Sequence, residues 1–209
     1  MLGTGERLDN GSGFYGVFEE SAIEHVELPS TLRKIEYGVF EKCKNLRGVV
    51  LPDGLEYLGK ACFKDSALES VGLPPTLKTI EESAFYNCEN LKSAEFSEGI
   101  EAISPLAFNK TAVENVTLPA SLRTIAQGAF AECKSLKAVQ FCEGLETLGT
   151  HQYAKNRKIL PGVFEESSVE HVELPRTLKR IEYSVFEKCK NLKSINLPGG
   201  LEYVGEKCF

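Results

Sequence analysis

The stretch from Phe63 to Phe85 reads F-K-D-S-A-L-E-S-V-G-L-P-P-T-L-K-T-I-E-E-S-A-F, and its apolar frame recurs from Phe18 to Phe209 in this chain of 209 residues. In general form the frame is F-x-x-[CST]-x-L-x-x-V-x-L-P-x-x-L-x-x-I-x-x-x-x-F. Successive copies lie 22 or 23 residues apart, except for one step of 34, and their phenylalanines are Phe18, Phe40, Phe63, Phe85, Phe108, Phe130, Phe164, Phe186 and Phe209. Self-similarity at such a period is the signature of a repeat architecture.

Copies of two types alternate. One type has a cysteine three residues after the phenylalanine, at Cys43, Cys88, Cys133 and Cys189. The other type has serine or threonine there and is one residue shorter, at Ser21, Ser66, Thr111 and Ser167. The unit is therefore 22 + 23 = 45 residues long. On a larger scale, residues 16–63 and 162–209 are identical at 34 of 48 positions, which indicates duplication of whole blocks.

The frame predicts the path of one coil. The V-x-L-P segment alternates apolar and free positions, so we expect a short strand that ends at proline. A turn follows, L-x-x-I brings the chain back, and the stretch around the phenylalanine is short enough for a 3₁₀ or single helical turn. No coil buries its own apolar face, so the coils must stack. We predict a solenoid of about eight coils with a short-stranded parallel sheet over residues 14–209, preceded by an extension or linker over 1–13.

The frame resembles the leucine-rich repeats of the BspA type, also called the Treponema pallidum type. The resemblance is plain from Leu73-Pro74-Pro75-Thr76-Leu77 through Ala84-Phe85 to Cys88 and Leu91, and it covers about residues 14–209. It implies a leucine-rich repeat solenoid, and a surface protein of bacteria or protists that takes part in adhesion and protein binding. A cell-surface or secreted location is thus implied by the resemblance, with a cytoplasmic location as the alternative. Phe96 and Phe141 depart from the pattern because no proline follows them.

The amino-acid composition narrows the classes of partner that the chain can bind. Twenty-four Lys and Arg against 30 Asp and Glu give a net charge of −6, which argues against binding to a nucleic-acid backbone. No apolar run reaches the roughly 18 residues of a membrane-spanning helix, so no membrane insertion is expected. We expect a protein partner.

Two columns of charge alternate in sign from coil to coil. The first ladder, at the start of the predicted strands, is Glu24, Arg47, Glu69, Lys92, Glu114, Lys137, Glu170 and Lys193. The second ladder, in L-x-x-I, has the opposite phase: Arg33, Glu56, Lys78, Glu101, Arg123, Glu146, Lys179 and Glu202. Neighbouring strands lie about 4.8 Å apart, so opposite charges would attract between coils. We interpret the ladders as devices that fix the order of the coils, with an electrostatic binding strip as the alternative.

The sequence offers no constellation for catalysis, so we predict no enzyme, no cofactor and no metal. The cysteines of the Cys-type coils lie two coils apart, about 9–10 Å, too far for disulfides. His25 and His171 each lie beside a glutamate on the free face of a strand, and we interpret them as exposed face residues. No C-x-x-C, H-E-x-x-H or phosphate-binding loop is present.

The 34-residue step contains an insertion of 11 residues, at about 149–158. It is the one basic, aromatic-bearing cluster of an acidic chain, and it supplies our candidate partner-binding residues: His151, Tyr153, Lys155, Arg157 and Lys158. Long loops on repeat proteins often carry function. We therefore predict a non-catalytic protein-interaction or adhesion module. The alternative is a scaffold or spacer segment in a larger assembly, and the uncapped coils allow end-to-end self-association.

Overall fold

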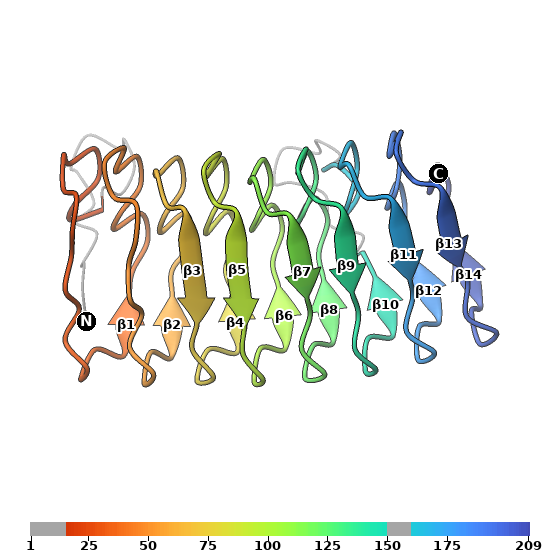
Figure 1. The fold of residues 1–209 in the computed structure, drawn as a ribbon. Coiled ribbons are helices and arrows are strands. Elements are labelled where there is room, and N and C mark those ends of the chain that lie inside the picture. Colours follow the sequence, from red (N-terminus) through yellow and green to blue (C-terminus); the bar gives the residue numbers. More distant parts are fainter. Residues whose placement is uncertain (1–15, 150–159) are drawn as a thin grey trace, which may run out of the picture.

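The computed structural model describes residues 16–149 and 160–209, and within them the chain forms a parallel β-solenoid (Figure 1). The coils stand in one row, with the first coil at one end and the last at the other. This confirms the predicted leucine-rich repeat solenoid and its parallel sheets. Residues 1–13 lie outside the described residues, so their assignment as an extension stays a prediction.

The short strands form two rows, and from β3 onward each coil contributes to both; the first two coils contribute a strand only to the second row. The row formed by V-x-L segments contains β3 (Ser70–Leu73), β5 (Ser93–Phe96), β7 (Asn115–Thr117), β9 (Ala138–Gln140), β11 (His171–Glu173) and β13 (Ser194–Asn196). The row that follows the turns contains β1 (Lys34–Ile35), β2 (Tyr57–Leu58), β4 (Thr79–Ile80), β6 (Ala102–Ile103), β8 (Thr124–Ile125), β10 (Thr147–Leu148), β12 (Arg180–Ile181) and β14 (Tyr203–Val204).

Equivalent residues of successive coils pair in register. The second row includes a six-stranded parallel sheet in the order β14-β12-β10-β8-β6-β4, and the first row a four-stranded sheet in the order β13-β11-β9-β7. Val116 pairs with Val139 and Val139 with Val172, so one apolar residue type lines one position of the stack. Strand β3 shows why apolar residues recur at these positions: Val71 and Leu73 point into the core, while Ser70 and Gly72 face outward. Alternation along the strand thus buries one side of each coil against its neighbours.

The phenylalanines form a continuous stack through the core. Neighbouring ring centroids from Phe18 to Phe209 are 5.0–5.9 Å apart, with interplanar angles of 4–12°. Phe130 stacks on Phe164 at 5.7 Å, although 34 residues separate them. The frame therefore continues at Phe164, and the extra residues leave the column unbroken.

The structure corrects the predicted 3₁₀ or helical turn around each phenylalanine. In the described residues the segment is a pair of separate turns, as where Glu41 N–H donates to Gly38 O (2.9 Å) and Cys43 N–H to Phe40 O (3.3 Å). Gly38 (φ 61°) and Lys42 (φ 59°) both adopt the left-handed conformation, which a right-handed helix excludes. This conformation turns the N–H groups of Phe40 and Lys42 toward the next coil.

The hydrogen bonds between coils explain why the left-handed residues are tolerated. Phe40 N–H donates to Cys62 O at 2.8 Å and Lys42 N–H to Lys64 O at 2.7 Å. Corresponding bonds recur along the stack up to Phe186, whose N–H donates to Cys208 O at 2.8 Å. Left-handed residues cost about 1–2 kcal/mol each, and the recurring bonds and buried rings offset that cost.

Candidate functional site

The predicted partner-binding residues His151, Tyr153, Lys155, Arg157 and Lys158 all lie outside the described residues. The structure does place the two ends of the insertion. The chain leaves the regular coil at Gly149 after β10, where Gly149 N–H donates to Ile125 O at 3.0 Å, and the regular frame resumes at Pro161 before the Phe164 turn. Gly59 makes the same bond to Ile35 O in a regular coil. The insertion therefore enters at the equivalent of Gly59, and residues 150–160 are the 11 additional ones.

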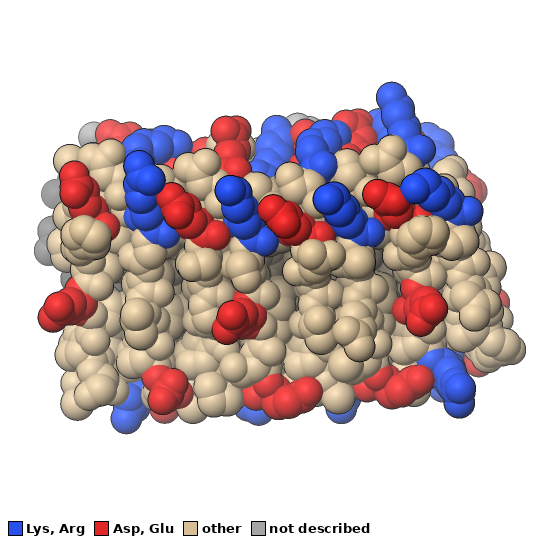
Figure 2. Space-filling model, in the orientation of Figure 1, with Lys and Arg blue, Asp and Glu red and all other residues tan. Residues whose placement is uncertain are grey.

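The first ladder runs along one edge of the V-x-L face, and Figure 2 shows it as a row of alternating red and blue side chains. Ion pairs form between Arg47 and Glu69 (3.2 Å) and between Glu170 and Lys193 (2.6 Å). In the second ladder, Lys78 lies 3.0 Å from Glu101. These charges are exposed, so each pair contributes about 0–1 kcal/mol. The predicted juxtaposition of opposite charges on neighbouring coils is confirmed at these pairs.

A third set of charges, which our sequence analysis missed, surrounds the phenylalanine turns. Lys42 lies 2.7 Å from Glu20, Lys64 lies 2.6 Å from Glu41, and Lys188 lies 3.0 Å from Glu165. Hydrogen bonding to Lys42 lowers the pKa of Glu20. The sequence does contain a signal for these charges, because the second residue after the phenylalanine is charged in every coil but one. In order, these residues are Glu20, Lys42, Asp65, Asn87, Lys110, Glu132, Glu166 and Lys188.

The V-x-L face presents a flat surface of small and polar side chains. Its outward residues are exposed in every coil: His25/Glu27, Gly48/Val50, Ser70/Gly72, Ser93/Glu95, Asn115/Thr117, Ala138/Gln140, His171/Glu173 and Ser194/Asn196. His171 Nδ1 lies 2.8 Å from Ser194 Oγ on the next coil. A shallow hollow of about 370 Å³ over β5 and β7 is lined by Glu95, Asn115, Thr117 and others. His25 and His171 are thus exposed face residues, as predicted.

The coils that depart from the family pattern use a side chain to hold the next coil. Where Phe96 lacks a following proline, Glu98 accepts hydrogen bonds from the backbone N–H groups of Ala120 (3.1 Å) and Ser121 (3.2 Å). Glu143 does the same for Arg176 and Thr177 after Phe141. These carboxylates lock the turns of adjacent coils together.

The cysteines of the Cys-type coils, which we call the column cysteines, pack in the stack. They are Cys43, Cys88, Cys133 and Cys189. Cys88 Sγ donates to Phe63 O at 3.0 Å and lies 3.4 Å from Ser66 Oγ, and the other column cysteines repeat the pattern. All seven cysteines are free thiols. Burial raises the pKa of Cys88 to about 12 and that of Cys133 to about 11. A buried, protonated thiol is a poor nucleophile and a poor metal ligand at neutral pH.

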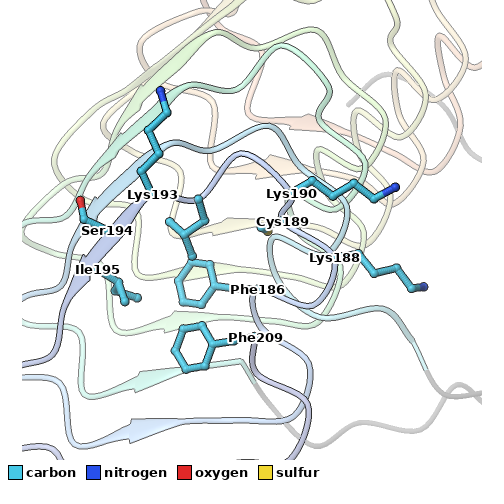
Figure 3. A pocket seen from close by; sticks show the side chains of 9 residues that line it. Phe186, Lys188, Cys189, Lys190, Lys193, Ser194, Ile195 and Phe209 are labelled. Atoms are coloured by element: carbon cyan, nitrogen blue, oxygen red, sulfur yellow. The ribbon is translucent and has the colours of Figure 1, made fainter.

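The last coil leaves a hollow of about 370 Å³ at the C-terminal end of the stack, beside the rings of Phe186 and Phe209 (Figure 3). Leu192 and Ile195 line it from the V-x-L side and Cys189 from the turn. We call this surface the C-terminal end face. Across residues 16–149 and 160–209, no group of three or more His, Cys, Asp or Glu is arranged to hold a metal, and no helix is suited to crossing a membrane.

Comparison with known protein families tests the resemblance to BspA-type leucine-rich repeats. The model of the BspA type leucine rich repeat region matches residues 15–137, 58–163 and 157–209. The chain belongs to this family. No curated protein matches the sequence.

Two solved structures show the same fold. The leucine-rich repeat protein of T. pallidum is 22% identical, with a TM-score of 0.59 over 92% of this chain and 77% of that chain. The pneumococcal vaccine antigen PcpA is 24% identical, with a TM-score of 0.55 over 85% of this chain and 57% of that one. At these identities the likeness concerns the solenoid itself.

Proposed function

We propose that this BspA-type chain is a non-catalytic protein-interaction or adhesion module that recognises its partner through the insertion at 150–160. The supporting observation is the unbroken phenylalanine column. Phe130 and Phe164 stack at 5.7 Å on either side of the insertion, so the core does not require the extra residues. A segment that the fold does not need, and that carries His151, Tyr153, Lys155, Arg157 and Lys158 on an acidic chain, is suited to recognition.

The chemistry of the partner follows from the charge of the insertion. Three cations and a tyrosine within a few residues fit an acidic protein surface, and such contacts weaken as salt rises. The V-x-L face is less suited to tight binding when taken alone, because its outward residues include no Trp, Tyr or Arg. As part of the same proposal we place the module at the cell surface or outside the cell, on the strength of its family.

A binding experiment tests the proposal. Fluorescence anisotropy of a labelled Glu/Asp-rich peptide would be compared for the wild-type chain, for deletion of residues 150–160, and for Lys92→Gln as a control that removes a cation elsewhere. We expect wild type and control to bind, with affinity falling as salt rises, and the deletion to lose binding. Binding retained by the deletion variant would move recognition to the V-x-L face.

A spacer is the second candidate function, and the ladders favour it. Charges that alternate at every coil keep the coils in order and so keep the length of the stack constant. For a spacer, we expect neither the wild-type chain nor the deletion variant to bind the acidic peptide.

A further inference from the structure

A hollow lies on the turn side of the stack, where one Ser-type coil passes between two Cys-type coils. Between the phenylalanine turn and the V-x-L strand, this Ser-type coil has a single residue, Ser168, where a Cys-type coil has two, such as Lys190-Asn191. Ser168 N–H donates to Cys133 O of the preceding coil at 3.2 Å. The shorter coil leaves room between its neighbours, and a hollow of about 290 Å³ opens there.

Three lysines from the two flanking coils line this hollow, which we call the lysine hollow. Lys134 belongs to the coil before Ser168, and Lys188 and Lys190 belong to the coil after it. Figure 3 shows Lys188 and Lys190 extending from the same side of their turn, away from the ring stack. Glu166 is the one carboxylate of the lining, so the lining residues carry three positive charges and one negative charge, a net charge of +2.

The three lysines retain hydrogen-bond donors for a ligand. Lys134 Nζ donates to Glu166 O at 2.8 Å and to Glu166 Oε2 at 3.4 Å. Lys188 Nζ donates to Glu165 Oε1 at 3.0 Å and to Glu166 Oε1 at 3.2 Å. An ammonium group has three donors, so each of these lysines keeps one. Lys190 has no hydrogen-bond or ion-pair partner within residues 16–149 and 160–209. Hydrogen bonds from Lys188 and Lys134 lower the pKa of Glu166, as a positive environment does.

The corresponding positions around two other Ser-type coils are not basic. Beside Ala67, the residues that correspond to the three lysines and Glu166 have a net charge of −1: Lys44, Asn87, Glu89 and Asp65. Beside Ala112, the corresponding residues have no net charge: Glu89, Glu132, Lys134 and Lys110. The position of Ser168 is itself an alanine in the other Ser-type coils, at Ala22, Ala67 and Ala112. Within the described residues, a net positive charge and a hydroxyl group therefore occur together at the lysine hollow.

We propose that the lysine hollow binds a phosphate group. A phosphate monoester carries close to two negative charges at neutral pH, which balances the net charge of +2 of the lining residues. Its terminal oxygens accept several hydrogen bonds, and the lining supplies ammonium, hydroxyl and amide donors from Lys134, Lys188, Lys190, Ser168 and Asn191. A carboxylate has one charge and two oxygens, so it would leave part of this charge and some of these donors unmatched.

An NMR titration of the ¹⁵N-labelled full chain with inorganic phosphate, at constant ionic strength, tests the proposal. We expect the amide signals of Ser168, Lys190 and Asn191 to shift and to saturate as phosphate is added. The amide signal of Lys44, which holds the corresponding position beside Ala67, should stay constant. Acetate at the same ionic strength should bind more weakly than phosphate, because it has half the charge.

Three variants connect the binding to the lining residues. Lys190→Gln should weaken phosphate binding about tenfold, because it removes a charged hydrogen-bond donor. Ser168→Ala introduces the residue of the other Ser-type coils, so the fold should tolerate it, and the loss of one hydroxyl should weaken binding about threefold. Lys44→Gln is the matched control, because it removes a lysine from the same position of another coil, and it should bind phosphate as wild type does.

Glycerol phosphate as a second probe distinguishes a phosphate ester from the free ion. Binding of glycerol phosphate at least as tight as that of inorganic phosphate would assign the hollow to an ester, and weaker binding would assign it to the free ion. The proposal would be overturned if neither probe produced saturable shifts at Ser168, Lys190 and Asn191. Equal affinities of Lys190→Gln and Lys44→Gln for phosphate would also overturn it, because the bound phosphate would then not depend on the lysine hollow.

Discussion

Each phenylalanine of the column supports two coils at once. Phe85 is fully buried and stacks on Phe63 at 5.6 Å and on Phe108 at 5.0 Å. Stacked rings contribute about 0.5–1.5 kcal/mol beyond the area they bury. Because a coil has no core of its own, losing one ring weakens its contacts with both neighbours.

The substitution Phe85→Ala should therefore lower the free energy of unfolding by about 3–5 kcal/mol. Urea unfolding followed by circular dichroism measures this loss. Val50→Ala is the control, because Val50 is 83% exposed on the V-x-L face and its truncation should change stability by less than about 0.5 kcal/mol. Similar losses in the two variants would contradict a buried phenylalanine column.

The buried thiol of Cys88 predicts loss of stability at alkaline pH. Burial raises its pKa from 9.0 to about 12, so the folded state favours the protonated form. The resulting stabilisation is complete below pH 9.0 and is lost as pH rises toward about 12. Cys88→Ala should show a shallower alkaline decline in unfolding free energy than wild type, whereas Cys142→Ala, at a half-exposed position, should follow wild type. Parallel declines in all three proteins would show that Cys88 is not buried as described.

At the scale of one element, the turn around the phenylalanine is the part that the sequence did not predict. Its left-handed positions are occupied by Gly38 and Asn87, which favour this conformation, but also by Leu106 and Lys110, which do not. No residue type is favoured at these left-handed positions, because hydrogen bonds to the next coil impose the left-handed conformation. The strands and ladders were predictable for the opposite reason, since each position repeats one residue class.

The first ladder makes a prediction about salt. Lys92→Glu places a glutamate between Glu69 and Glu114, whose coils it joins by backbone bonds of 2.9 and 3.2 Å. At low salt we expect a loss of about 0–1 kcal/mol in unfolding free energy, and the loss should shrink at high salt because exposed charges are screened. Lys92→Gln removes the attraction without adding repulsion and should lose less. If reversal and neutralisation are equal at low salt, the columns are not in contact.

For the whole molecule, the repeated frame made the fold predictable but did not predict the binding site. Nine phenylalanines in one frame determine the stack, including its continuation at Phe164. The insertion occurs once, so no second copy constrains its conformation, and its five candidate residues stay predictions.

One continuous core passes the insertion without depending on it. Chemical unfolding of the chain that lacks residues 150–160 tests this continuity, because the deletion restores a step of 34 − 11 = 23 residues between Phe130 and Phe164. We predict a single transition with the midpoint of the wild-type protein. A second, earlier transition, or a midpoint clearly below that of wild type, would show that the coils on the two sides of the insertion do not form one stack.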